Sequence, residues 1–282
     1  MNNKKTSLLI LATVMLLSSC GVVATQNTPI SQTVENQTTE ASKSQSFSYE
    51  DYAEVLSTYV NENGEVDYAQ LKENRAALDR FNQSLGQVTR ATYESWTESE
   101  QIAFWVNAYN SFTLQAIIDK YPVKSIKNIP GVWKFLKFEI LGESMTLDGI
   151  EHKVLRKEFN EPRIHMALVC AAVSCPYLRQ EPYEGDKLEA QLEENTIQFL
   201  SLDSNFSLDA EAETVKLSAI FKWFKEDWEA TYGTEEKFTK FNSKEGSVLN
   251  FITNYVEGED LTKLEGAQKI SYIDYDWSLN KQ

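Results

Sequence analysis

The chain has 282 residues, of which 42% are hydrophobic, 12% aromatic and 24% charged. This composition is typical of a folded globular protein and excludes a chain that is disordered throughout. The formal net charge of −15, without any dense basic cluster, argues against a protein that binds the phosphate backbone of nucleic acid.

The first 20 residues have the parts of a bacterial lipoprotein signal peptide. Lys4 and Lys5 make a basic start, and the apolar stretch 8–17 is shorter than the about 20 residues that span a bilayer. It ends in LSSCG (17–21), and small residues before a cysteine resemble a lipobox. We therefore expect export and a lipid on Cys20 that tethers the protein to a bacterial membrane, on the periplasmic side or at the outer membrane. The alternative is an ordinary secretory signal in which Cys20 is incidental.

Residues 21–46 are rich in Thr, Ser, Gln, Asn and Glu and predict a flexible polar linker. Residues 47–282 are then expected to form one globular domain. Apolar residues at helical spacing predict a helix at 47–60 with Ser48 as its N-cap, and an extended piece followed by a second helix within 66–85. Thr97 and Glu100 form a capping-box pair that begins a helix to about residue 119. This helix is apolar on nearly all sides, which predicts that it is buried.

The centre and the C-terminal part of the chain add short strands to more helices. Residues 134–146 predict a β-hairpin, and Asp148 with Glu151 resemble a cap pair for a helix to about residue 159. The predicted strands are 164–169, a hairpin of 206–208 and 215–217, and 273–277. The predicted helices are 188–202, 218–233 with Ser218 as cap, and 247–255 with Ser247 as cap. The fold class predicted is α+β, helix-dominant, with a small and mainly antiparallel sheet of short strands.

Five segments resemble the DUF547 family, a family of undetermined function. They are GEVDYAQL (64–71), FWVNAYNSFTLQAI (104–117), LDGIEHKVLR (147–156), RIHMALVCAAVSCPYLR (163–179) and YIDYDWSLN (272–280). The resemblance runs from about residue 48 to 280 in the same order. It implies that the domain begins near residue 48, and it draws attention to the histidines and cysteines of the central segments. It implies no particular reaction.

The cysteines and histidines are few and close together. If Cys20 carries lipid, only Cys170 and Cys175 remain, and the two histidines, His152 and His165, lie within the same 24-residue window. A thiolate is a strong nucleophile when a neighbouring imidazolium or the first turn of a helix lowers its pKa. We hypothesise that Cys175 is such a nucleophile and that Pro176 begins a helical turn beside it.

In this hypothesis one of the two histidines, His152 more than His165, is the base. Asn107 or Asn110 would orient its ring, as in Cys-His-Asn enzymes, and Glu151 is a further candidate site residue. Both asparagines lie on the buried helix, where an amide without partners is costly. The predicted activity is that of a thiol hydrolase or transferase on peptide-like amides or thioesters.

Three other interpretations of the cluster remain open. Cys170 and Cys175 could form a structural disulfide, because export favours oxidation. The four residues could bind zinc, although their spacing matches no familiar zinc pattern. They could also be inert within a non-catalytic interaction or scaffolding domain. The sequence has no nucleotide-binding or common hydrolase motif, so we expect no cofactor. Met145, Met166 and the aromatic stretch 223–228 are expected in the core.

Overall fold

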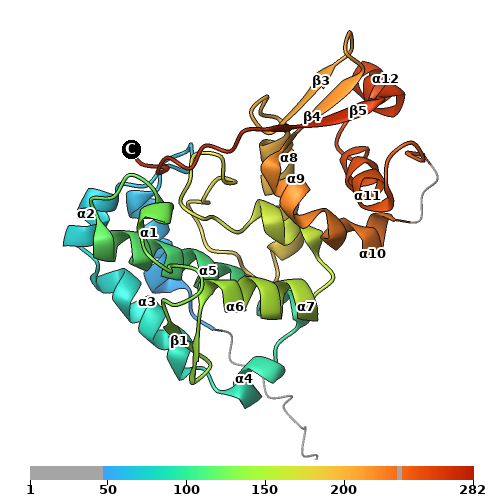
Figure 1. The fold of residues 1–282 in the computed structure, drawn as a ribbon. Coiled ribbons are helices and arrows are strands. Elements are labelled where there is room, and N and C mark those ends of the chain that lie inside the picture. Colours follow the sequence, from blue (N-terminus) through green and yellow to red (C-terminus); the bar gives the residue numbers. More distant parts are fainter. Residues whose placement is uncertain (1–46, 234–236) are drawn as a thin grey trace, which may run out of the picture. The chain divides into compact units, whose positions relative to one another are not determined.

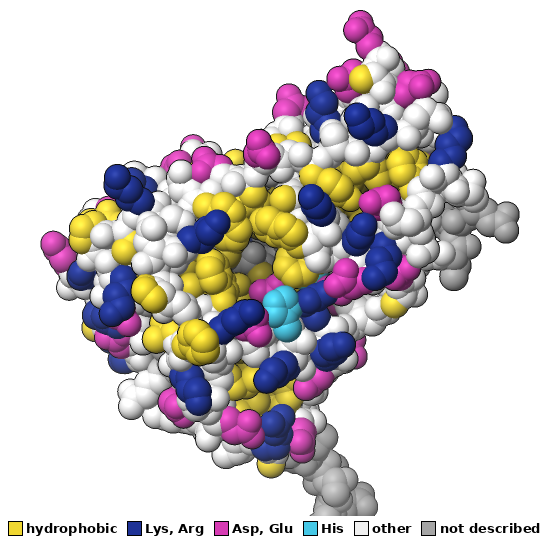
Figure 2. Space-filling model, in the orientation of Figure 1, with side chains coloured by type: hydrophobic (Ala, Val, Ile, Leu, Met, Phe, Trp, Pro, Cys, Tyr) yellow, Lys and Arg dark blue, Asp and Glu magenta, His cyan; other side chains and the backbone are white. Residues whose placement is uncertain are grey.

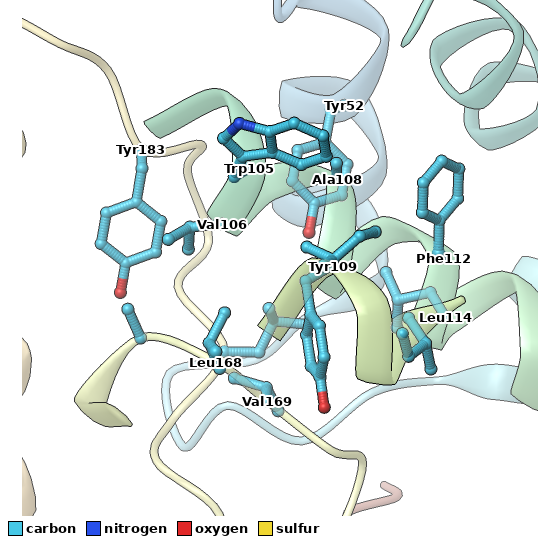
Figure 3. Close-up of a cluster of buried hydrophobic side chains, with 14 of the residues drawn as sticks. Tyr52, Trp105, Val106, Ala108, Tyr109, Phe112, Leu114, Leu168, Val169 and Tyr183 are labelled. Carbon is cyan, nitrogen blue, oxygen red and sulfur yellow. The ribbon is translucent and has the colours of Figure 1, made fainter. Parts of the chain in front are cut away.

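The predicted buried helix is the centre of the fold in the computed structural model, which describes residues 47–233 and 237–282. Helix α5 (Glu98–Lys120) begins with the predicted capping box. The Thr97 N–H donates to Glu100 Oε2 at 2.8 Å, and the Glu100 N–H donates to Thr97 Oγ1 at 3.3 Å. Side chains on all sides of α5 are buried, and Figure 3 shows Trp105, Tyr109 and Phe112 of this helix within a cluster of buried hydrophobic side chains.

Within residues 47–97, the helices that precede α5 are α1 (Glu50–Tyr59), α2 (Tyr68–Glu73), α3 (Ala76–Gln87) and α4 (Arg90–Glu94). Helix α1 packs on α3, and both α2 and α3 pack on α5. The expected Ser48 cap is wrong by one residue, because Tyr49 holds the N-cap position without a side-chain cap. The expected second helix is divided into α2 and α3, since the chain leaves helical geometry at Asn74.

A hairpin and an irregular helical segment follow α5 and the short η1 (Ile126–Asn128). The hairpin pairs β1 (Phe138–Ile140) with β2 (Glu143–Met145). Next come α6 (Leu147–Gly149), a π-helical segment η2 (Ile150–Leu155) and α7 (Arg156–Glu158). The predicted Asp148–Glu151 cap is wrong, because Thr146 is the N-cap and accepts the Gly149 N–H at 3.0 Å. π-Helical segments are rare and are often found at functional sites.

The expected strand at 164–169 is wrong. Residues Pro162–Met166 form a 3₁₀ helix, η3, because Pro162 suits a first helical turn and the Glu161 side chain accepts the Arg163 N–H. The chain then runs without regular structure to α8 (Leu188–Leu200), the predicted helix.

The C-terminal elements surround a three-stranded sheet. In it β3 (Phe206–Asp209) pairs antiparallel with β4 (Thr214–Ser218), which pairs parallel with β5 (Lys269–Ile273). The helices between β4 and β5 are α9 (Ala219–Phe224), η4 (Lys225–Trp228), α10 (Glu229–Tyr232), α11 (Ser243–Ile252) and α12 (Gly258–Gly266). Ser218 caps α9 as predicted, whereas α11 begins at an Asn242 cap and encloses Ser247. The predicted last strand is wrong in part, since β5 ends at Ile273.

The segment after β5 returns to the first half of the chain (Figure 1). Lys281 forms a bridge with Val66, and Leu279 forms one with Ala172. The tail thus lies against the loop that carries both candidate cysteines. The architecture is α+β and helix-rich, as the sequence predicts, and within the described residues its short strands form two small sheets rather than one. Residues 1–46, which include the predicted signal peptide, Cys20 and the linker, lie outside the described residues.

Candidate functional site

A cavity of about 370 Å³ brings together most of the candidate residues. Its walls come from α5, η2, the loop after η3, α9 and the C-terminal tail. Figure 2 shows a hollow on the surface between hydrophobic side chains, with histidine and charged side chains nearby. The lining residues are Tyr109, Trp133, Lys134, Asp148, Glu151, His152, His165, Leu168, Cys170, Cys175, Ile220, Trp223, Phe224, Tyr275 and Trp277.

The loop between Cys170 and Cys175 wraps its own backbone around the second sulfur. The Cys170 N–H donates to Cys175 Sγ at 3.0 Å, and the Ala172 backbone is hydrogen-bonded to the same sulfur. Between them Ala171 has a φ of 58°, in the left-handed region that a residue with a Cβ rarely adopts. Backbone N–H groups that converge in this way form an anion-binding concavity, and here the anion would be a thiolate.

A third donor reaches the sulfur from the C-terminal tail. The Tyr275 hydroxyl donates to Cys175 Sγ at 3.1 Å and lies 3.3 Å from Cys170 Sγ. Both cysteines are free and their side chains are hydrogen-bonded to each other. Burial alone would raise the pKa of Cys175, but the hydrogen bonds from Cys170, Tyr275 and the two backbone groups outweigh it and lower that pKa. The pKa of Cys170 is raised by its hydrogen bond to Cys175 and by burial.

The backbone donors differ from those expected. Residues 176–179 are not helical, so the turn predicted after Pro176 is wrong. The donors come from the residues that precede Cys175, and the left-handed Ala171 makes this possible. Cys175 lines the cavity and is only 4% exposed.

Neither imidazole is hydrogen-bonded to Cys175. His165 is buried, stacks on Phe224 with 4.1 Å between ring centroids, and has Nε2 2.7 Å from Asp227 Oδ2. Because a carboxylate can only accept, His165 Nε2 carries the proton. Arg156 donates to His152 Nδ1 at 2.8 Å, which occupies the lone pair that a base needs. Burial is the largest cause that lowers the pKa of both rings.

Glu151 is a buried carboxyl in the cavity wall with a strongly raised pKa. Burial raises its pKa to about 7, against the opposing effects of the Arg156 charge and a hydrogen bond with Tyr109. Tyr109 in turn is hydrogen-bonded to Trp133. Glu151 can therefore give or take a proton at physiological pH, which is the property that general acid–base catalysis requires.

The two asparagines of α5 are hydrogen-bonded to the backbone of other segments and not to an imidazole. Asn107 accepts the Tyr183 N–H at 3.0 Å and donates to the Tyr183 carbonyl at 2.7 Å. Asn110 accepts the Val169 N–H at 2.9 Å and donates to the Ala167 carbonyl at 3.0 Å. The expectation that buried amides are paired is confirmed. Asn110 therefore holds the backbone just before Cys170 in place. Neither asparagine is hydrogen-bonded to a histidine.

Several residues of the cavity had no local sequence signal. Tyr275 and Asp227 lie 100 residues beyond Cys175 and 62 residues beyond His165, so only the folded chain brings them there. Trp223, expected in the core, is 41% exposed at the cavity, whereas Trp228 and Met166 are buried as expected. Tyr275 and Trp277 are predicted only as part of a strand at 273–277 and of a tail segment that resembles DUF547, and neither signal indicates a role at the cavity.

The described residues give no support to a metal centre or a membrane-spanning helix. No group of three or more His, Cys, Asp or Glu side chains among them is arranged to hold a metal ion. None of the helices within 47–233 and 237–282 has the length and apolar character needed to cross a bilayer.

Comparison with known proteins gives one match. No curated protein and no solved structure is significantly similar to the chain. The family model described as "Protein of unknown function, DUF547" matches residues 93–200, which include α5, Glu151, both histidines and both cysteines of the cavity. Over this segment, which contains the predicted segments 104–117, 147–156 and 163–179 but not 64–71 or 272–280, the chain is similar to DUF547, and the family's description names no function.

Proposed function

We propose that the domain is a cysteine-nucleophile hydrolase or transferase that acts on peptide-like amides or thioesters, with Cys175 as the nucleophile. The observation that carries the proposal is the set of donors on Cys175 Sγ, which accepts the Cys170 N–H at 3.0 Å and the Tyr275 O–H at 3.1 Å inside the cavity. Donors to the anionic form favour the thiolate, so Cys175 needs no adjacent imidazole to lose its proton.

Glu151, rather than a histidine, is the acid and base of this mechanism. In the first step the Cys175 thiolate attacks the carbonyl carbon, the bond to the leaving group breaks, and the neutral Glu151 carboxyl donates a proton to the leaving nitrogen or sulfur. In the second step the Glu151 carboxylate takes a proton from water or another acceptor, which attacks the thioester and releases Cys175. A pKa of about 7 lets Glu151 act in both directions.

The cavity wall favours an apolar acyl group. Trp277 lines the cavity with its ring centroid 5.7 Å from that of Trp223 and 6.0 Å from that of Trp133. Leu168 and Ile220 extend the apolar surface inward. Pockets of a few hundred Å³ with aromatic walls and few polar groups are typical of small-molecule sites. The substrate expected is thus a small thioester or amide with an aromatic or aliphatic acyl part.

Alkylation of the full-length protein tests this proposal. At pH 7, iodoacetamide should modify Cys175 faster than it modifies a free model thiol, as measured by mass spectrometry of the individual cysteine peptides. Cys175→Ala should abolish turnover of aryl thioesters and leave the melting temperature nearly unchanged. Cys170→Ala keeps the backbone N–H that faces Cys175 and loses only the hydrogen bond of the Cys170 side chain, so it should retain turnover, with alkylation of Cys175 slowed only by the rise in its pKa.

Two results would reject an enzyme. One is a Cys175 that reacts more slowly than the model thiol. The other is thioester turnover that survives in Cys175→Ala. Either result would favour the competing interpretation, a non-catalytic interaction or scaffolding domain in which the cavity residues serve stability.

We also propose that the protein is a lipoprotein anchored to a bacterial membrane through Cys20. The support is the basic start, the short apolar stretch and the small residues before Cys20. In bacteria fed an alkyne-tagged fatty acid, the wild-type protein should be labelled and sediment with membranes. Cys20→Ser should lose the label and the membrane fraction, and equal labelling of this variant would refute lipidation at Cys20.

A further inference from the structure

Cys170 is a second thiol in the cavity that the proposed acyl transfer does not use. It is half-buried, lines the same cavity, and is hydrogen-bonded to the Cys175 side chain. The Tyr275 hydroxyl contacts both sulfurs, at 3.3 Å from Cys170 and 3.1 Å from Cys175. Two thiols in this arrangement need only small side-chain rotations to approach bonding distance.

The two thiols are also chemically unequal. Backbone and hydroxyl donors converge on Cys175, whereas the Cys170 thiol gives its own hydrogen bond to that sulfur. The Cys175 sulfur is therefore the attacking thiolate, and the Cys170 thiol remains protonated beside it. This division of roles is what a dithiol needs to exchange with a disulfide in two steps.

We propose that Cys170 is the resolving thiol of Cys175, and that the pair carries out thiol–disulfide exchange with small-molecule disulfides. The proposal rests on the reactive Cys175 of the proposed function and adds a second reaction at the same cavity. In the first step the Cys175 thiolate attacks one sulfur of R–S–S–R, forming Cys175–S–S–R and releasing R–S⁻. In the second step Cys170 gives its proton to the released R–S⁻ and attacks Cys175 Sγ. The products are a Cys170–Cys175 disulfide and a second R–S⁻.

Closure of this disulfide would stop acyl transfer reversibly. It removes the thiolate from Cys175, so an oxidised protein cannot form a thioester. The bond closes a very short loop, and short loops gain little from the chain-entropy effect of a crosslink. A dithiol reagent should therefore reopen it readily, as is usual for labile rather than structural disulfides.

The test uses reduced full-length protein that carries Cys20→Ser, incubated with oxidised glutathione and analysed by non-reducing mass spectrometry. With both cavity cysteines present, the protein should lose the mass of two hydrogen atoms and show Cys170 and Cys175 in one crosslinked peptide. Cys170→Ser should instead accumulate a glutathione adduct on Cys175, on the order of tenfold above the adduct seen when Cys170 is present. Dithiothreitol should reverse both products.

The outcomes separate this inference from the proposed function. If both proteins accumulate the same stable adduct, Cys170 is not a resolving thiol, and Cys175 remains a candidate nucleophile. If oxidised glutathione leaves Cys175 unmodified while iodoacetamide labels it, the exchange reaction is wrong and the nucleophile stands. If neither reagent modifies Cys175, both proposals fall together.

Discussion

Asp227→Ala should lower the free energy of unfolding by about 3–5 kcal/mol at pH 7, since it leaves buried donors without their acceptor. Asp227 Oδ2 lies 2.7 Å from His165 Nε2, and its two oxygens accept a bidentate pair of hydrogen bonds from Arg156 at 2.5 and 2.8 Å. The side chains of Asp227 and Arg156 are 17% and 16% exposed, so water cannot replace the lost partner fully. Urea unfolding of the variant and the wild type measures the difference.

The loss of unfolding free energy in Asp227→Ala should become smaller as the pH falls. Burial would raise the pKa of Asp227, but the hydrogen bonds from His165 and Arg156 lower it from 3.8 to about 2. A folded-state pKa below the unfolded value stabilises the protein above about pH 4, and that contribution disappears as the pH falls toward 2. The difference between variant and wild type should therefore shrink in acid.

Asp79→Ala is the matched control for Asp227→Ala. Asp79 also forms an ion pair with an arginine, Arg75, at 2.9 Å, but its side chain is 46% exposed. Pairs of this kind contribute about 0–1 kcal/mol. If Asp227→Ala destabilised the protein no more than Asp79→Ala, the buried network of Asp227, Arg156 and His165 would have no special part in holding the cavity wall.

Glu151→Gln should raise the free energy of unfolding at pH 8 by as much as about 3 kcal/mol and should change it little at pH 4.5. Burial raises the pKa of Glu151 from 4.5 to about 7, so folding favours the neutral carboxyl. The wild type therefore loses stability as the pH rises through this interval, and the amide, which never ionises, does not. Thermal unfolding at the two pH values gives the comparison.

The activity of Glu151→Gln should change in the opposite direction. An amide cannot exchange protons with a leaving group, so turnover at Cys175 should fall by about 10²–10⁴-fold while alkylation by iodoacetamide persists. Glu143→Gln, at an exposed position of the β1–β2 hairpin, should alter stability by less than about 0.5 kcal/mol at either pH. A Glu151→Gln protein with normal turnover would remove the carboxyl from the proposed mechanism.

The sequence predicts well those parts of the fold that depend on near neighbours. The Thr97–Glu100 capping box and the all-round apolar pattern after it locate α5 and its burial, because both signals lie within the helix itself. The strand expected at 164–169 failed since a short apolar run fits a buried 3₁₀ turn equally well. Local propensity does not decide between them, whereas the packing of the segment against α8 does.

For the candidate site, the sequence predicts which residues are involved better than it predicts their roles. Scarcity and clustering pointed to Cys170, Cys175, His152 and His165, and all four line one cavity. The roles of these residues depend on partners far along the chain. Asp227 is hydrogen-bonded to His165, and Arg156 is hydrogen-bonded to His152. The Tyr275 hydroxyl donates to Cys175 Sγ. The thiolate is therefore stabilised by hydroxyl and backbone donors and not by an imidazole. The positive φ of Ala171, which aims those backbone donors, has no signature in a stretch without glycine or asparagine.

The pH dependence of Cys175 alkylation by iodoacetamide tests the central claim most directly. In a Cys20→Ser background, with modification followed on the Cys175 peptide by mass spectrometry, the rate should rise with an apparent pKa below the about 8.5 of a free cysteine, and Tyr275→Phe should move that pKa upward by removing one donor. An apparent pKa at or above that of a free cysteine, unchanged in Tyr275→Phe, would contradict a thiolate held by Tyr275 and the backbone of its own loop.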